Sequence, residues 1–137
     1  MADDTPSIQL VKSYVEAVQR ARASGEADEF EAIREFLATD FVIKSASPWT
    51  DEPWQVQHRG ADAWITRLQA PINKASSLTT ENVTVQQAGD DVYVEQLSTI
   101  VDGEGPHVSM VCHIFSVVDG LITGVRGYRN ERGLPAG

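Results

Sequence analysis

The sequence predicts an α+β fold in which helices cover one face of a curled antiparallel sheet. Apolar residues recur at helical spacing in the first half of the chain, the period changes to two from Leu78 onward, and Asp119-Gly120 separates two β-branched runs. Asp-Gly is a strong hairpin signal because both central residues of a type I′ turn need positive φ. Helices and strands grouped along the chain in this way argue for helices on one face of a sheet.

The first helix is expected to start at Thr5-Pro6, where a hydroxyl can cap the helix and proline needs no amide donor. Its apolar stripe is Ile8, Val11, Val15 and Val18. Tyr14 lies on the flank of that stripe, and the helix should end near Ser24-Gly25.

A second helix is expected over residues 28–38 and a third from Gly60, which Pro71 should end or kink. The expected strands cover residues 41–45, 78–86, 92–101, 108–118 and 121–130. In the strand over 78–86, Val83 and Val85 alternate with polar residues that include Asn82.

Residues 47–59 are expected to form an irregular loop with two prolines and two tryptophans, Trp49 and Trp54. These rings either cover the end of the core or form a flap or rim over a pocket, and buried aromatic rings serve packing more often than binding.

Composition limits the class of protein. The 137 residues suit one domain over 1–137, with an ordered core over about 6–130. Eleven basic and twenty acidic residues give a net charge of −9, which disfavours nucleic acid and anionic membrane surfaces. With neither a membrane-spanning run nor an apolar leader in the sequence, the expected location is cytoplasmic.

Neither a metal nor another cofactor is expected. The single Cys112 leaves no internal disulfide and no cysteine-built metal site, and it suits a small buried apolar position. The three histidines, His58, His107 and His113, give no convergent ligand spacing apart from the distant pair His107 and His113.

Three motifs together resemble the SnoaL-like branch of the nuclear transport factor 2 superfamily. They are residues 36–42 (FLATDFV), residues 58–64 (HRGADAW), and residues 113–122 (HIFSVVDGLI) followed by 128–130 (YRN). This resemblance implies a cone-shaped, curved, mixed or antiparallel sheet wrapped around three N-terminal helices, with a deep apolar cavity. It also implies a homodimer joined through the outer sheet face. The related folds include ketosteroid isomerases, limonene-type epoxide hydrolases, scytalone dehydratase, polyketide cyclases and plain binding modules, so the site must be argued from its own residues.

Strand alternation, with the face chosen by the resemblance, predicts which side chains line the cavity. The inward set is Val94, Gln96, Ser98 and Ile100; Ser109, Val111, His113 and Phe115; and Gly124, Arg126, Tyr128 and Asn130. A register error of one residue would exchange every one of these with its outward neighbour.

The mechanism of the epoxide hydrolases fits the chain poorly. The epoxide hydrolases use two aspartates bridged by an arginine. The aspartates correspond to Ser98 and Asn130, and the arginine corresponds to Gln96. The tyrosine and asparagine that orient the attacking water correspond to Ile43 and Ser45. Neither carboxylate is present, and an amide at Asn130 cannot accept the proton of the attacking water.

Two further relatives match in part. The tyrosine of the ketosteroid isomerases corresponds to Tyr14, but their carboxylate base corresponds to Ser45. The serine of scytalone dehydratase corresponds to Ser109, while Val111 replaces its asparagine.

The candidate catalytic residues are His113, Tyr14 and Asn130. The histidine would move a proton, and the tyrosine or asparagine would polarise a ligand oxygen. The alternatives are that His113 is a hydrogen-bonded core residue and that Tyr14 only packs. His58, ahead of the third helix, suits a surface or rim position.

The expected ligand-binding residues are Ser45, Trp49, Trp54, Trp64, Gln96, Ser98, Ser109, Phe115, Arg126 and Tyr128. Arg126 would need a ligand carboxylate or Glu95 as partner if it points inward, because an unpaired buried guanidinium is costly. The other reading is a solvated outer position.

Two functions remain open. One is a cofactor-independent isomerase, dehydratase or cyclase acting on a hydrophobic, oxygenated polyketide, terpenoid or steroid-like ligand. The other is a non-catalytic ligand-binding or assembly module that lacks the catalytic carboxylates of the related enzymes.

Overall fold

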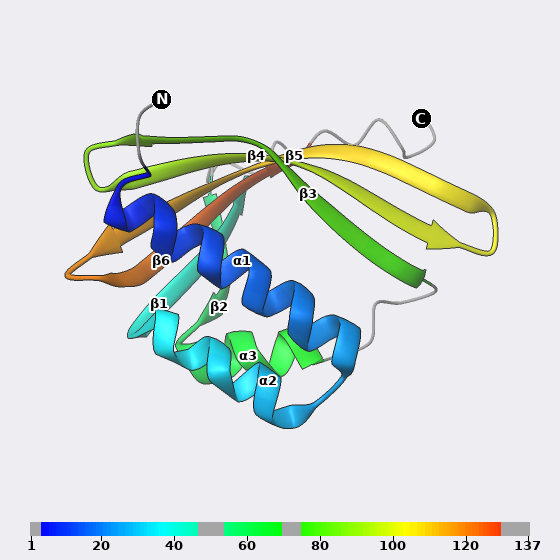
Figure 1. The fold of residues 1–137 in the computed structure, drawn as a ribbon, viewed down its shortest axis with the longest axis horizontal. Coiled ribbons are helices and arrows are strands. Elements are labelled where there is room, and N and C mark those ends of the chain that lie inside the picture. The colour runs from blue at the N-terminus through cyan, green and yellow to red at the C-terminus, as the bar shows by residue number, and fades with distance from the viewer. Residues whose placement is uncertain (1–3, 47–53, 70–74, 130–137) are drawn as a thin grey trace.

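The computed structural model describes residues 4–46, 54–69 and 75–129, and it has the predicted α+β architecture (Figure 1). The elements are α1 (Pro6–Ser24), α2 (Ala27–Ala32), the 3₁₀ helix η1 (Ile33–Phe36), β1 (Leu37–Ala46), β2 (Trp54–Arg59), α3 (Ala61–Gln69), β3 (Ala75–Ala88), β4 (Asp91–Asp102), β5 (Gly105–Val118) and β6 (Leu121–Arg129). The described strands form a curved sheet in the order β2-β1-β6-β5-β4-β3, which arches over the helices. Every neighbouring pair is antiparallel except β1 and β6, which are parallel.

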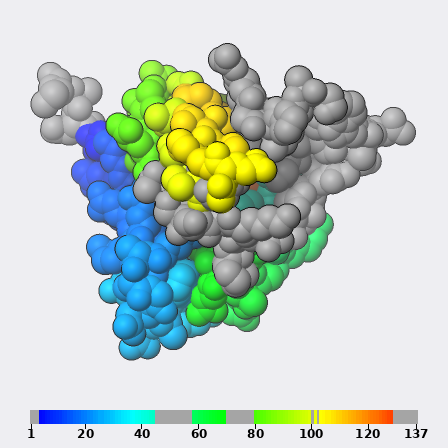
Figure 2. Space-filling view, turned by 90° about the vertical axis from the view of Figure 1, so that its right-hand side faces the viewer, coloured from blue at the N-terminus to red at the C-terminus, as the bar shows by residue number. Residues whose placement is uncertain are grey.

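The helices fill the hollow of the sheet. Seen from the end at which β4 and β5 project, the tips of these strands (yellow) lie above α2 (blue) and α3 (green) (Figure 2). None of the described helices combines the length and the apolar character needed to cross a membrane.

Helix α1 has the ends that its sequence predicts. The Thr5 side chain accepts a hydrogen bond from the backbone N–H of Ile8 at 3.2 Å, and Pro6 follows it in the first turn. At the other end Gly25 is left-handed, with φ 70°, and its N–H donates to Ala21 O at 2.8 Å. Both boundaries are therefore confirmed.

The second helix is shorter than predicted. Helix α2 ends at Ala32, and Leu37 already belongs to β1, where it pairs with Ile122 of β6. The helical spacing of the apolar residues predicted a helix that includes Leu37, but pairing with a distant strand outweighs local helix propensity here. Strand β1 is correspondingly longer than the expected 41–45.

Strand β2 is absent from the prediction, which placed a loop over residues 47–59. It pairs antiparallel with β1 at the edge of the sheet, from Val42 opposite Arg59 to Ala46 opposite Trp54. Its sequence, WQVQHR, has two strand-favouring residues, Trp54 and Val56, but it follows Pro48 and Pro53, which indicated a loop.

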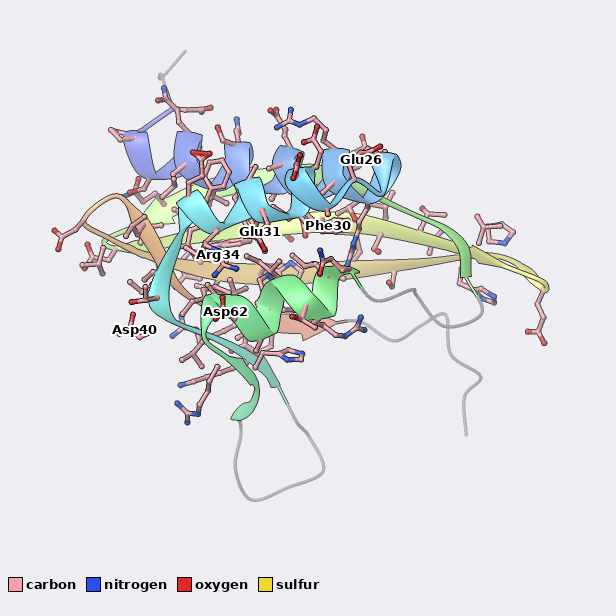
Figure 3. The ribbon with its side chains drawn as sticks, turned by 90° about the horizontal axis from the view of Figure 1, so that it is seen from below. Glu26, Phe30, Glu31, Arg34, Asp40 and Asp62 are labelled. Carbon is pink, nitrogen blue, oxygen red and sulfur yellow. The ribbon has the colours of Figure 1, made fainter. Side chains whose placement is uncertain are left out.

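Surface ion pairs connect the helices. Arg34 of η1 bonds to Glu31 of α2, with Nε 3.1 Å from a carboxylate oxygen, and also pairs with Asp62 of α3 (Figure 3). Because these groups are exposed, the network bridges the three helices but adds little stability.

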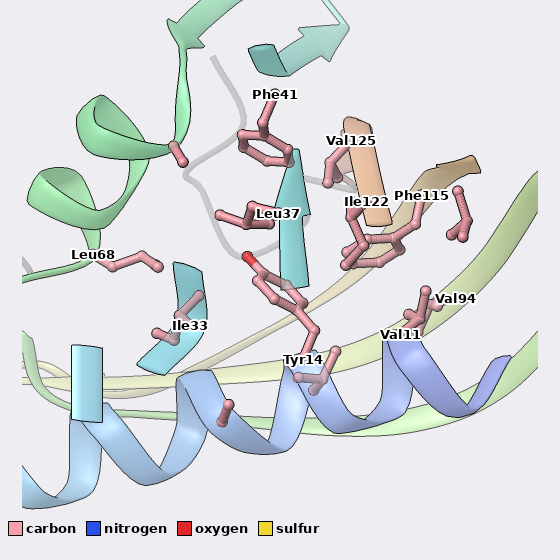
Figure 4. Packing of buried hydrophobic residues seen from close by; sticks show 14 of the residues in the cluster. Val11, Tyr14, Ile33, Leu37, Phe41, Leu68, Val94, Phe115, Ile122 and Val125 are labelled. Carbon is pink, nitrogen blue, oxygen red and sulfur yellow. The ribbon is translucent and has the colours of Figure 1, made fainter. Parts of the chain in front are cut away.

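The core lies between the helices and the inner face of the sheet. Its fully buried side chains include Val11 of α1, Ile33 of η1, Phe41 of β1 and Ile122 of β6. Figure 4 shows these side chains converging from α1, η1 and the strands, with the Tyr14 ring among them. The core therefore connects all the layers of the fold.

The Asp119-Gly120 turn has the conformation that the sequence predicts. Asp119 has φ 53° and Gly120 has φ 76°, as a type I′ turn requires at its two central positions.

This conformation predicts that Gly120→Ala destabilises the protein by about 1 kcal/mol, because a side chain disfavours the left-handed region. The matched control is Gly103→Ala in the turn between β4 and β5. Gly103 is outside the positive-φ region, and a Cβ at either position meets no atom within 4 Å. Urea unfolding of the two variants measures the difference, and equal losses would contradict the assignment.

Candidate functional site

The inner face of β4 and β5 carries the residues predicted for it. Val94 lies opposite His113, Gln96 opposite Val111, and Ser98 opposite Ser109. The buried residues of β4 are Val92, Val94, Gln96 and Ser98, whereas the intervening Tyr93 and Glu95 are exposed. The register and burial of β4 confirm the predicted alternation, and the register of β5 agrees with it, although Ile114 of β5, on the outer face, is also buried.

Strand β6 has the opposite faces from those predicted. His113 pairs with Gly127 and Phe115 with Val125, so Arg126 and Tyr128 point to the outer face. Their predicted inward placement is wrong.

A β-bulge causes this error. Ser116 pairs with Gly124 and Val117 with Ile122, which leaves Thr123 as an extra residue. Simple alternation after the Asp119-Gly120 turn would have put Arg126 opposite His113, and one extra residue exchanges the two faces.

Arg126 and Tyr128 therefore have surroundings unlike those expected for cavity residues. Arg126 Nη2 lies 3.4 Å from Asp91 Oδ2, so among the described residues Asp91, and not Glu95, is its carboxylate partner. Tyr128 is 46% exposed, on the same face as Cys112. Cys112 itself is only half-buried, and burial followed by the charge of Glu95 raises the pKa of its thiol.

His113 is half-buried on the inner face and is hydrogen-bonded within the sheet. Its Nδ1 lies 2.9 Å from Gln96 Oε1, and Gln96 Nε2 donates to Asn82 Oδ1 at 3.0 Å. The imidazole lies against Gly127, where an added Cβ would come within 3.1 Å of His113 Cδ2. The glycine thus provides the space that the ring occupies.

Tyr14 reaches the same region from α1. Its hydroxyl accepts a hydrogen bond from Trp64 Nε1 at 2.8 Å, and its ring contacts Phe115 edge-on at a centroid distance of 5.7 Å. Burial raises the pKa of Tyr14 to about 12, against the smaller lowering effects of the Trp64 hydrogen bond and the Arg22 charge. The phenol is therefore neutral at physiological pH and keeps a proton that it can donate.

The Phe115 ring brings His113 and Tyr14 into one group. The imidazole meets the Phe115 ring at a centroid distance of 6.1 Å, also edge-on. Phe115 is 3% exposed, so it belongs to the core wall beneath the site. A proton acceptor and a proton donor thus flank one apolar ring.

Two other predicted residues are placed by the packing. Trp64 is half-buried between Phe41, at a ring-centroid distance of 6.3 Å, and His58, at 5.6 Å. It therefore packs in the core while it caps the Tyr14 hydroxyl. His58 is half-buried beside it, at the end of β2.

Several predicted residues lie outside what the structure describes. Asn130 and Trp49 fall outside the described ranges, and so do the side chains of Ser45 in β1, Trp54 in β2 and Ile100 in β4. Their predicted roles stay predictions.

Asn82 is a site residue that sequence reasoning missed. Simple alternation would put Asn82 and Val85 on different faces of β3. In the structure Asn82 pairs with Gln96 and Val85 pairs with Val94, so both lie on the inner face. The extra residue is Val83, which is 58% exposed. A bulge in mid-strand has no distinct composition, so no signal in the sequence marks it.

A hollow lies on the outer face, where β1, β5 and β6 meet. It has a volume of about 190 Å³ and is lined by Val42, Lys44, Ser116, Thr123, Gly124, Val125 and Arg126. Within the described ranges, no three His, Cys, Asp or Glu side chains are grouped as a metal site would require.

Comparison with known proteins gives one family and many similar structures. The family described as the SnoaL-like domain matches residues 11–125. A search of curated proteins finds no match. The three structures described next share less than a quarter of their residues with this chain, so they support the fold alone.

Three of these structures illustrate the range. An LEH-like epoxide hydrolase of M. tuberculosis is 21% identical, with a TM-score of 0.66, covering 92% of this chain and 84% of its own. A protein of Jannaschia sp. CCS1, provisionally named a SnoaL-like polyketide cyclase, is 19% identical, with a TM-score of 0.66 and coverages of 96% and 92%. An NTF2-like protein of unknown function from Burkholderia pseudomallei K96243 is 14% identical, with a TM-score of 0.71 and coverages of 93% and 92%.

The burial of Tyr14 predicts a distinct alkaline titration. In the folded protein the Tyr14 phenol should keep its proton until about pH 12, whereas a tyrosine of the unfolded chain loses it near pH 10.0. The stabilisation from this proton is therefore fully present below pH 10 and is lost as the pH rises toward 12. The loss should reach roughly 2 to 3 kcal/mol. Absorbance titration of tyrosinate and urea unfolding across this range measure both effects.

Two variants control this titration. Tyr14→Phe should remove the last tyrosinate step, and Tyr93→Phe, at an exposed ring, should leave that step in place. A wild-type titration complete well below pH 12 would contradict the buried phenol.

Proposed function

The chain belongs to the SnoaL-like domain family, and from this premise we propose that it binds a hydrophobic, oxygen-bearing small molecule and performs acid/base chemistry on it without a cofactor. The reaction would be an isomerisation, a dehydration or a cyclisation. The observation that carries this proposal is the placement of His113 and Tyr14 around Phe115 on the inner face of the sheet.

His113 is the proposed general base. An imidazole titrates near neutrality and can both take and return a proton during one reaction cycle. His113 is half-buried, and Gln96 forms a hydrogen bond with its Nδ1. Among the described residues of the inner sheet face, it is the best suited to this role.

Tyr14 is the proposed electrophile. Its neutral phenol would donate a hydrogen bond to a ligand carbonyl or hydroxyl oxygen as negative charge develops there. The indole of Trp64 already donates to the phenol oxygen, and such a chain of hydrogen bonds strengthens the phenol as a donor. Asn130 stays a predicted second donor.

The ligand class follows from the walls of the site. Buried aromatic and β-branched residues, including Phe115 and Val94, favour an apolar ring system such as a polyketide, terpenoid or steroid-like compound. Epoxide hydrolysis, the reaction named for one similar structure, is disfavoured because the buried polar residues of β4 are Gln96 and Ser98 and not carboxylates.

A non-catalytic ligand-binding or assembly module is the alternative. Trp64 and Phe115 are engaged in core packing, and both ends of the Gln96 amide are bonded within the sheet. These observations indicate an interior filled by side chains, which favours the non-catalytic module. An experiment must therefore distinguish the two functions.

The test starts with native mass spectrometry of the protein purified from its source, which would detect a retained lipophilic ligand. That ligand and a panel of aromatic polyketides, cyclic terpenoid ketones and steroid enones then serve as substrates. His113→Ala should lower turnover by about 100- to 10,000-fold while changing binding little.

The matched control is His107→Ala, six positions earlier on β5 and thus about 20 Å away, which should keep normal turnover. Unchanged turnover in His113→Ala would exclude the histidine as base. A ligand that binds and is never converted by the wild-type protein would favour the binding module.

We also propose a homodimer formed through the outer sheet face. The exposed apolar residues there include Tyr93 of β4, Val108 and Met110 of β5, and Tyr128 of β6. Adjacent strands thus present apolar side chains on a single face, and a second copy of the chain would bury them.

Met110→Glu should therefore convert the dimer to a monomer, because it puts two like charges into a self-complementary interface. Ala63→Glu, at an exposed position of α3, adds the same charge away from the sheet and should leave the mass unchanged. Size-exclusion chromatography with light scattering reports both masses. A monomeric wild-type protein at micromolar concentration would exclude the homodimer.

A further inference from the structure

A row of three polar side chains crosses the inner face of the sheet. Asn82 of β3 accepts from Gln96 of β4 at 3.0 Å, and the other end of the Gln96 amide lies 2.9 Å from His113 Nδ1 on β5. Gln96 is 4% exposed, whereas Asn82 is at the exposed end of the row. Each member comes from a different strand, so the sheet register sets the alignment.

The chemistry of the row has a direction. Asn82 offers its carbonyl oxygen Oδ1, which can only accept, so Gln96 presents its NH₂ group to it. The Gln96 carbonyl oxygen then faces His113, and it also can only accept. Nδ1 of His113 must therefore carry the proton, and the lone pair of the neutral ring is on Nε2.

Burial and packing support this arrangement. If the Gln96 amide alone turned over, its oxygen would face the oxygen of Asn82, and two acceptors would meet without a proton between them. Gly127 lies against the Cδ2 and Nε2 edge of the imidazole, which keeps the Nδ1 edge toward Gln96.

We propose that Asn82 and Gln96 are positioning residues that hold His113 as its Nδ1–H tautomer, so that Nε2 is the nitrogen that accepts the substrate proton. This inference rests on the proposed role of His113 as general base. It also changes the predicted role of Gln96, whose amide serves the histidine and not the ligand. Asn82, at the far end of the row, acts on the reaction through two hydrogen bonds.

The tautomer can be measured directly by long-range ¹H–¹⁵N NMR of the full chain labelled with ¹⁵N-histidine, at a pH where the rings are neutral. His113→Ala assigns the signal of His113. The wild-type spectrum should show a protonated Nδ1 and an unprotonated Nε2. A wild-type Nε2–H tautomer would overturn the proposal.

Two substitutions at Asn82 test the row without disturbing the core. Asn82→Ala removes the acceptor and should yield a measurable Nε2–H population, whereas Asn82→Asp keeps an acceptor and should retain the wild-type tautomer. Gln96→Met removes the amide while preserving its length and should give the largest change. An unaltered tautomer in both Asn82→Ala and Gln96→Met would also overturn the proposal.

The NMR measurement of the His113 tautomer needs no substrate, so its result is independent of the proposed function. If turnover is found, Asn82→Ala should lower kcat and Asn82→Asp should restore it, a pattern that general loss of stability would not give. If His113→Ala leaves turnover unchanged, the proposed function fails while the NMR result still decides the positioning of the ring.

Discussion

The bulge at Thr123 determines what the inner face of the sheet contains. Thr123 is accommodated as one extra residue in β6, and its hydroxyl donates to Ser116 O across the strand pair at 3.2 Å. From that point on, the side chains of β6 exchange faces. Val125 enters the core, Gly127 comes beneath the imidazole, and the Arg126 guanidinium moves to the outer face. A charged group is thereby kept out of an apolar interior in which its desolvation would be costly.

The site and the core share the same side chains. Tyr14 and Phe115 are members of the buried cluster, and Trp64 packs against it while donating to the phenol. Helix α1 therefore contributes both to folding and to the proposed chemistry. Rigid packing of this kind holds functional groups in a fixed geometry, which favours catalysis when the donor must meet a developing charge.

The sequence predicts the elements better than their registers. Thr5-Pro6, Gly25 and Asp119-Gly120 mark ends and turns through local backbone chemistry, and the structure has each of them where expected. The faces of β4 and β5 were also predictable, because uninterrupted strands alternate strictly. His113 and Tyr14 could therefore be selected in advance, although nothing in the sequence alone placed them around one ring.

What the sequence missed depends on contacts between distant segments. Leu37 was assigned to a helix because its spacing is helical, but its pairing with Ile122 is decided more than eighty residues later. The bulges at Val83 and Thr123 have ordinary strand residues, and their effect appears only once neighbouring strands are aligned. The role of Asn82 arises wholly from such an alignment.

The parallel pairing of β1 with β6 has a consequence for how the chain folds as it is made. Strands β3 to β6 pair with sequential neighbours and can assemble as hairpins, and β1 can pair with β2, but the other edge of β1 must wait for β6 near the other end of the chain. Contacts of such long sequence separation slow folding. During synthesis, Leu37 and Phe41 would emerge well before β6 exists to cover them, so the nascent N-terminal segment would expose apolar side chains that the folded chain buries.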